Sequence, residues 1–119
     1  ILYYNQGGKY DGEWVNNKKE GKGILYYTKG GKYDGEWKND KKEGKGIDDY
    51  PNGYYEGNFF NGVREGKGIF YFKDGDKYDG EWKKNKKNGK TIFYYKNGDK
   101  YEGDYINDKI EGKGVYYQC

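Results

Sequence analysis

The sequence predicts an all-β protein made of consecutive β-hairpins, and one recurring motif is the main reason. The pattern Tyr-x-Gly-x-aromatic occurs five times at spacings of 23, 22, 23 and 23 residues, and its copies begin at Tyr10, Tyr33, Tyr55, Tyr78 and Tyr101. Each copy is followed by a Gly-Lys-Gly or Gly-Lys-Thr triplet and then by Ile or Val. A fixed period in this range indicates a repeat array rather than an ordinary globular core.

Each motif is expected to form the first strand of a hairpin. Between Lys9 and Val15, aromatic residues and glycine alternate with acidic residues, and a period of two that includes Tyr and Trp is typical of a strand. The next two residues are Asn16-Asn17, and the second position of this pair is Gly, Asn or Asp in every copy. These residues tolerate positive φ, which a tight hairpin turn requires.

The second strand of the first repeat is expected to run from Glu20 to Tyr27. A turn at Gly30-Gly31 follows, and the later copies have Asn-Gly or Asp-Gly at this point. The hairpins therefore follow one another as a meander. Two strands per repeat, each about 4.8 Å wide, give a ribbon on the order of 50 Å long for five repeats.

The alternation also predicts how the side chains divide between the two faces. Tyr10 and Trp14 are expected to share a face with Gly23 and Leu25, so that a glycine without Cβ gives each ring a flat seat. The acidic residues and the triplet lysines are expected on the other face. The row Ile24, Ile47, Ile69, Ile92 and Val115 falls on that polar face unless a bulge at the second glycine turns it inward, and the sequence leaves its face open.

Composition excludes several function classes. The 119 residues carry 23 basic and 20 acidic side chains, finely interleaved, for a net charge of +3. This is not the dense basic patch of a nucleic-acid-binding protein, so no nucleic-acid partner is predicted. A single cysteine forms no internal disulfide, which favours a reducing, intracellular setting. Because the chain starts in the middle of a repeat, it is expected to be a fragment of a larger protein.

No catalytic, cofactor or metal site is predicted. The sequence has no His and no Ser, so nucleophile–base pairs are lacking. Acidic pairs recur in every repeat on an exposed face, whereas a catalytic pair is needed once, in a pocket. The triplet Gly89-Lys90-Thr91 lacks the glycine and the helix of a phosphate-binding loop. The segment from Asp74 to Asp79 lacks the glycine and the glutamate of a calcium loop. No small-molecule substrate is expected.

The five copies resemble the MORN repeat (membrane occupation and recognition nexus). Phe59 and Tyr105 replace Trp, and Thr91 replaces a glycine. The resemblance implies an elongated, twisted antiparallel sheet, a solenoid-like array with a groove lined by aromatic residues. It implies a single domain over 1–119, with repeats at about 9–31, 32–53, 54–76, 77–99 and 100–119, and with 1–8 as the end of a preceding repeat.

The resemblance implies a non-catalytic scaffold that binds proteins in a cytoskeletal, ciliary or membrane-linked assembly. One alternative is a membrane-tethering module that binds acidic phospholipids such as phosphoinositides or phosphatidic acid. Another is an accessory region of a larger enzyme, such as a phosphoinositide kinase or a lysine methyltransferase. The expected location is intracellular, in the cytoplasm, the cytoskeleton or a cilium, with membrane association as a further option.

Two sets of residues are candidates for binding. The aromatic set would hold a protein partner, or a second copy of the array in a homodimer, and comprises Tyr10, Trp14, Tyr33, Trp37, Tyr55, Phe59, Tyr78, Trp82, Tyr101 and Tyr105. For the three tryptophans, a place in the thin core is the favoured interpretation. The lysine set near the hairpin tips would hold acidic lipid headgroups and comprises Lys18, Lys19, Lys41, Lys42, Lys86 and Lys87. Functional differences are expected where copies vary, as at Asp48-Asp49, Phe59-Phe60 and Thr91.

Overall fold

Eleven strands in chain order form one sheet in the computed structural model, which describes residues 2–4 and 8–119. Each strand pairs antiparallel with its neighbours in sequence. The strands are β1 (Leu2–Tyr3), β2 (Lys9–Val15), β3 (Lys18–Tyr26), β4 (Lys32–Lys38), β5 (Lys41–Tyr50), β6 (Gly53–Phe60), β7 (Val63–Phe72), β8 (Lys77–Lys83), β9 (Lys86–Tyr94), β10 (Lys100–Ile106) and β11 (Lys109–Tyr117). The predicted meander of hairpins is confirmed.

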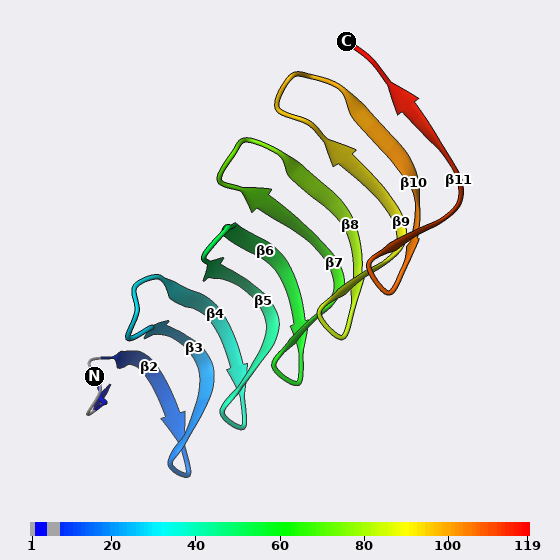
Figure 1. Cartoon of the computed structure of the whole chain (residues 1–119). Helices are drawn as coiled ribbons and strands as arrows, with labels where there is room; N and C mark the ends of the chain where they lie inside the picture. The colour runs from blue at the N-terminus through cyan, green and yellow to red at the C-terminus, as the bar shows by residue number, and fades with distance from the viewer. Residues whose placement is uncertain (1, 5–7) are drawn as a thin grey trace.

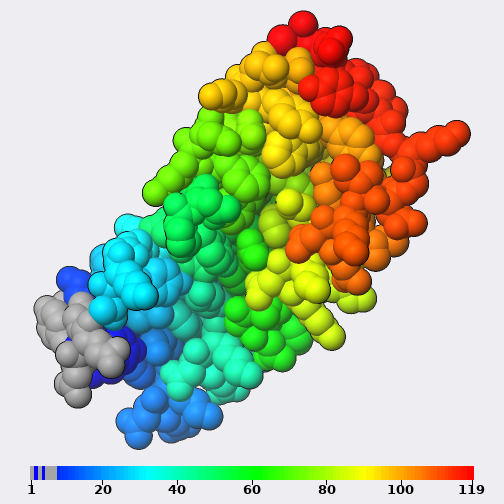
Figure 2. All heavy atoms as spheres, in the orientation of Figure 1, coloured from blue at the N-terminus to red at the C-terminus, as the bar shows by residue number. Residues whose placement is uncertain are grey.

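The sheet is an elongated body of 50 × 24 × 18 Å, which agrees with the predicted ribbon length. Successive hairpins follow one another along its long axis, and the chain advances from one end to the other without a crossover (Figure 1, Figure 2). Of the segment 1–8, residues 1 and 5–7 lie outside the described residues. Leu2 pairs with Tyr10 as Leu25 pairs with Tyr33 in the next hairpin.

The hairpin turns form as the sequence predicts. In the first repeat, Asn16 and Asn17 have φ values of 51° and 66°. The equivalent pairs in the other four repeats also lie in the left-handed region, even where the first residue is Lys84. Two consecutive positive φ values give the turn a twist that matches the right-handed twist of the flanking strands.

A bulge sits inside every hairpin, but at the first glycine of the triplet rather than the second. In the first repeat, Gly12 lies opposite Gly23 and Trp14 lies opposite Lys19, so one residue of β2 faces three residues of β3. Gly21, within the bulge, has a φ of 72°, which favours glycine. The bulge therefore brings Lys19, in place of Gly21, directly opposite Trp14.

The register also settles the face of the isoleucine row. Ile24 pairs with Asp11 on one side and with Asp34 on the other, whereas Tyr10 pairs with Leu25. Neighbours directly opposite in a sheet project to the same side, so Ile24 lies on the face away from Tyr10. We call the face of the motif tyrosines the aromatic face and the face of Asp11 and Ile24 the groove face.

Candidate functional site

The aromatic face is a continuous row of interlocking rings. Tyr33 contacts Trp37 of its own repeat at a ring-centroid distance of 5.0 Å and Phe59 of the next repeat at 5.2 Å, both edge to face. Tyr55 makes the same two contacts with Phe59 and Trp82. Edge-to-face pairs at these distances are favourable beyond the area they bury. The row therefore joins each repeat to the next.

The triplet glycines provide the predicted ring seats. A Cβ built on Gly68 would lie 2.0 Å from the Tyr55 hydroxyl oxygen, which no side chain can occupy without moving the ring. The Tyr55 hydroxyl donates a hydrogen bond of 2.9 Å to the Asn58 carbonyl. In the fourth repeat Thr91 replaces the seat glycine and is buried, and its hydroxyl bonds the Asp79 carbonyl at 3.3 Å.

Most of the aromatic candidates are enclosed by their neighbours. Of the ten aromatic candidates, eight are buried, and Tyr10, Tyr33, Tyr55 and Tyr78 have no exposed surface. They lie on one side of a single sheet, and their own rings and the seat glycines enclose them. Trp14, which is 38% exposed, and the half-buried Tyr101 are the two with accessible surface. These two residues offer accessible surface in the folded chain, and partner binding by the whole set stays a prediction.

Burial raises the pKa of the tyrosines in this row. For Tyr33 and Tyr55 the pKa lies well above its usual range, and for Tyr78 it rises to about 12. The main cause is that a buried phenolate would lose its hydration. These hydroxyls are therefore packing and hydrogen-bonding groups, not acids or bases that work near neutral pH.

The lysine set divides into two classes. Lys19, Lys42 and Lys87 are half-buried on the aromatic face, where their ammonium groups lie over the rings; the Lys87 nitrogen is 5.4 Å from the centre of the Tyr78 ring. Arg64 takes the equivalent place in the third repeat, 4.5 Å from the Trp82 ring. Cations at these distances are attracted to the ring faces. The other members, Lys18, Lys41 and Lys86, are exposed at the tips.

One carboxylate is buried within the aromatic face. Asp48 is 1% exposed and stands in the column that Leu25 and Phe70 occupy in other repeats. It accepts a hydrogen bond from the Tyr27 hydroxyl, and the Lys42 ammonium nitrogen lies 2.7 Å from its Oδ2. Burial and this carboxylate raise the pKa of Tyr27 well above its usual range. The sequence marks Asp48 as a variation between copies, but its partners emerge only from the register.

The hairpin tips form a mixed apolar and basic edge. Val15, Phe60 and Ile106 are 53%, 55% and 51% exposed at the ends of β2, β6 and β10. Each pairs directly with a residue that begins the following strand, as Val15 pairs with Lys18. We call this edge, with its exposed lysines, the tip edge, and it comprises Val15, Lys18, Lys38, Lys41, Phe60, Lys83, Lys86, Ile106 and Lys109.

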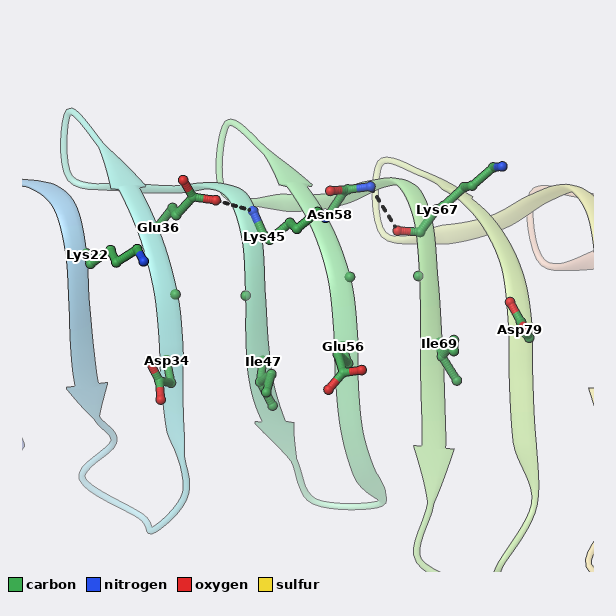
Figure 3. A pocket seen from close by; sticks show the side chains of 14 residues that line it. Lys22, Asp34, Glu36, Lys45, Ile47, Glu56, Asn58, Lys67, Ile69 and Asp79 are labelled. Carbon is green, nitrogen blue, oxygen red and sulfur yellow. Dashed lines mark hydrogen bonds between the residues drawn. The ribbon is translucent and has the colours of Figure 1, made fainter.

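The groove face carries an open groove of about 920 Å³ over β3 to β8. Figure 3 shows Asp34, Ile47, Glu56, Ile69 and Asp79 in one line across successive strands. A second depression of about 740 Å³ shares Lys67 and Asp79 with the first and continues to β11. We call this line the central row, and it comprises Asp11, Ile24, Asp34, Ile47, Glu56, Ile69, Asp79, Ile92, Glu102 and Val115.

Two kinds of carboxylate occur on the groove face. Glu36 is part of the fold, because its Oε2 accepts a 2.8 Å hydrogen bond from the Lys45 backbone amide beside the bulge (Figure 3). The carboxylates of Asp34, Glu56 and Asp79 in the central row make no hydrogen bond or ion pair within the described part of the chain. The second kind is thus available to a ligand, and the isoleucines between them add apolar surface.

This arrangement is suited to binding. Over residues 2–4 and 8–119, no three His, Cys, Asp or Glu side chains come together as a metal-binding group. In the same residues, no helix is long and apolar enough to cross a membrane. The groove has a long floor of backbone with charges and isoleucines at fixed intervals.

A comparison with protein families gives five consecutive matches. The family model described as MORN repeat matches residues 10–32, 33–53, 55–77, 78–100 and 101–118. No curated protein matches the chain.

Proposed function

The chain belongs to the MORN-repeat family, and from this membership we propose that it is a scaffold that holds a protein partner in the groove of the central row. Repeats of this family are interaction modules and are generally non-catalytic. The proposed setting is a cytoskeletal, ciliary or membrane-linked assembly inside the cell.

One observation carries this proposal. The aromatic face uses its rings for the fold, whereas on the groove face the carboxylates of the central row named above have no hydrogen-bond or ion-pair partner among the described residues. Ile47 is 40% exposed and Ile69 is half-buried, and both line the groove. Apolar surface of isoleucines that meets water has a cost that a bound partner would remove.

The test is recovery of a cross-linked partner from cells that express the tagged chain. The double variant Ile47→Lys/Ile69→Lys should lose the partner, because two charged side chains would lie where the partner covers apolar surface. The matched control Val15→Lys/Phe60→Lys places the same charges at the tip edge and should retain it. Equal recovery by both variants would contradict binding in the groove.

A second candidate is binding to acidic phospholipids at the tip edge, and the exposed Val15, Phe60 and Ile106 favour it. Apolar side chains that enter a lipid surface, flanked by lysines that attract anionic headgroups, are the features of an interfacial membrane contact. The half-buried Lys19, Lys42 and Lys87 would contribute less than the exposed Lys18, Lys41 and Lys86.

Vesicle flotation with charge-matched variants separates the candidates. Flotation with vesicles that contain phosphatidic acid or a phosphoinositide should be reduced by Phe60→Glu together with Lys41→Glu and retained by Ile47→Glu together with Lys45→Glu, which makes the same change of charge in the groove. Flotation that is insensitive to the tip edge would exclude this contact. Partner recovery lost through the groove variant, without any vesicle binding, would leave the scaffold as the function.

A further inference from the structure

The carboxylates of the central row recur at a regular distance. Asp34, Glu56 and Asp79 lie on β4, β6 and β8, so each is two strands from the next. Two inter-strand spacings amount to about 9.6 Å. Glu102 continues the row on β10. Its Oε1 lies 3.4 Å from the Lys100 ammonium nitrogen, which neutralises part of the carboxylate charge.

Few backbone conformations repeat at this distance. A polyproline II segment advances about 9.3 Å in each turn of three residues, and every third side chain points the same way. A β-strand places same-side residues about 6.7 Å apart. In an α-helix, residues i and i+7 are about 10.5 Å apart, and the mismatch accumulates to a few ångström over four repeats. The polyproline II conformation therefore fits the row best.

Resting on the proposed function, we propose that the groove binds an extended, polyproline II segment of a partner with Lys or Arg at every third position. The segment runs along the array, perpendicular to the strands. Its cations contact Asp34, Glu56 and Asp79, and the residues between them cover Ile47 and Ile69. Five carboxylates from the first repeat to the last span about 38 Å, the length of about 12 residues in this conformation.

The lysines beside the central row make the spacing selective. Lys45 and Lys67 line the groove on one side. Lys32 and Lys77 lie two positions from Asp34 and Asp79 on the same strands, on the other side of the row. A cation of the partner that misses a carboxylate meets one of these lysines, and like charges in such positions are repelled. The proposed ligand is therefore defined by the spacing of its cations and not by its net positive charge alone.

The test compares two 15-residue peptides of equal composition by fluorescence anisotropy at physiological salt. The first has Arg at every third position with Pro and Ala between, and the second has the same residues with Arg at irregular intervals. We expect the regular peptide to bind the chain about 10-fold tighter, because several exposed charge pairs form together only in that register. Equal affinities would overturn the proposal.

Variants assign the effect to the row. Asp34→Asn/Glu56→Gln/Asp79→Asn should remove the preference for the regular peptide. The control Glu20→Gln/Glu43→Gln/Glu65→Gln removes the same charge at carboxylates that accept turn amides, as Glu20 does from Asn39 at 2.9 Å, and should keep it. Equal loss in both variants would also overturn the proposal.

The outcome is distinguishable from failure of the proposed function. If neither peptide binds while a cross-linked partner is still lost through Ile47→Lys/Ile69→Lys, the groove is an interaction site for a ligand of another chemistry, and only this inference is wrong. If the partner is retained by that variant, the scaffold function of the groove is wrong as well.

Discussion

The two faces of this sheet use the same repeat for different purposes. The aromatic face places Tyr33, Tyr55 and Tyr78 where no solvent reaches them. The groove face presents Asp34 and Glu56, each next in sequence to one of those buried rings, and Ile47, which pairs with both; all three are exposed. The difference teaches that the residues that define the motif build the array, while the residues between them are free to bind. Four measurements test this division of roles between the two faces.

The largest effect is expected from truncation of a buried ring. Tyr55→Ala should lower the free energy of unfolding by about 3–5 kcal/mol, because it removes two ring contacts and a hydroxyl hydrogen bond at the centre of the row. Its neighbour Tyr54 is 40% exposed on the groove face and stacks on Tyr71 at 4.7 Å. Tyr54→Ala should cost about 1 kcal/mol or less. Urea unfolding of both variants measures this contrast, and equal losses would refute it.

Alkaline pH should act through the aromatic face. The folded pKa values of Tyr33, Tyr55 and Tyr78 are raised, so above pH 10 the unfolded chain loses these protons while the folded chain keeps them. The stabilisation is complete below pH 10 and falls as the pH rises toward the folded pKa values, by about 1.4 kcal/mol per pH unit for each tyrosine.

Urea unfolding at pH 9, 10 and 11 measures this loss, roughly 4 kcal/mol at pH 11 for the three tyrosines together. The variant Tyr55→Phe serves as the control, because its pH dependence should be shallower by the share of one tyrosine. Stability that stays constant up to pH 11 would show that these hydroxyls ionise freely in the folded chain.

A smaller effect is expected at a ring seat. Gly68→Ala should cost about 1–3 kcal/mol, because its Cβ pushes against the Tyr55 ring and the core is already filled. In the Tyr55→Ala background the cost should be at least about 0.5 kcal/mol smaller, since the three atoms nearest to the added Cβ, at 2.0, 2.3 and 2.4 Å, all belong to the Tyr55 side chain. The cycle is measured by chemical denaturation. Additive losses would mean that the glycine serves something other than the ring.

The smallest effect on stability should come from the groove face. Ile47→Lys/Ile69→Lys should change the free energy of unfolding by less than about 1 kcal/mol, because both side chains already meet water. Thermal unfolding of this variant beside wild type measures it. A loss as large as that of Tyr55→Ala would show that the isoleucines belong to the core. The groove would then not be a site separate from the core.

Much of the fold could be predicted from local patterns. The spacing of the motif tyrosines predicts the array, and the pair Asn16-Asn17 and its equivalents predict the turns, because few residues accept two positive φ values in succession. The ring seats follow from Gly12 and Gly23, which alternate with side chains on the correct face. Each of these features depends on neighbours within one or two repeats.

The place of the bulge could not be predicted, and it decides the face of the isoleucine row. Gly21 gives no sign in the sequence that it, rather than Gly23, interrupts the pairing. One extra residue at Gly23 would have turned Ile24 toward Tyr10, whereas the two extra residues around Gly21 leave Ile24 on the groove face and bring Lys19 opposite Trp14. The sequence also shows how aromatic a strand is but not whether its rings enclose one another, and the expected aromatic groove rested on the resemblance to the MORN repeat. The opposite face carries the isoleucine row, in which Ile47 is exposed and the other three isoleucines are half-buried.

The buried Asp48 affects which hairpins pair with one another during folding. Nearly identical hairpins could pair out of sequence and still stack their rings, and such errors trap repeat proteins during folding. Asp48 needs the Tyr27 hydroxyl of the preceding copy, whereas the residue equivalent to Tyr27 in the third copy is Phe72, which has no hydroxyl. A misplaced second hairpin would bury a carboxylate without its donor. The hydrogen bond between Tyr27 and Asp48 thus favours pairing of the second hairpin with the first copy over pairing with the third.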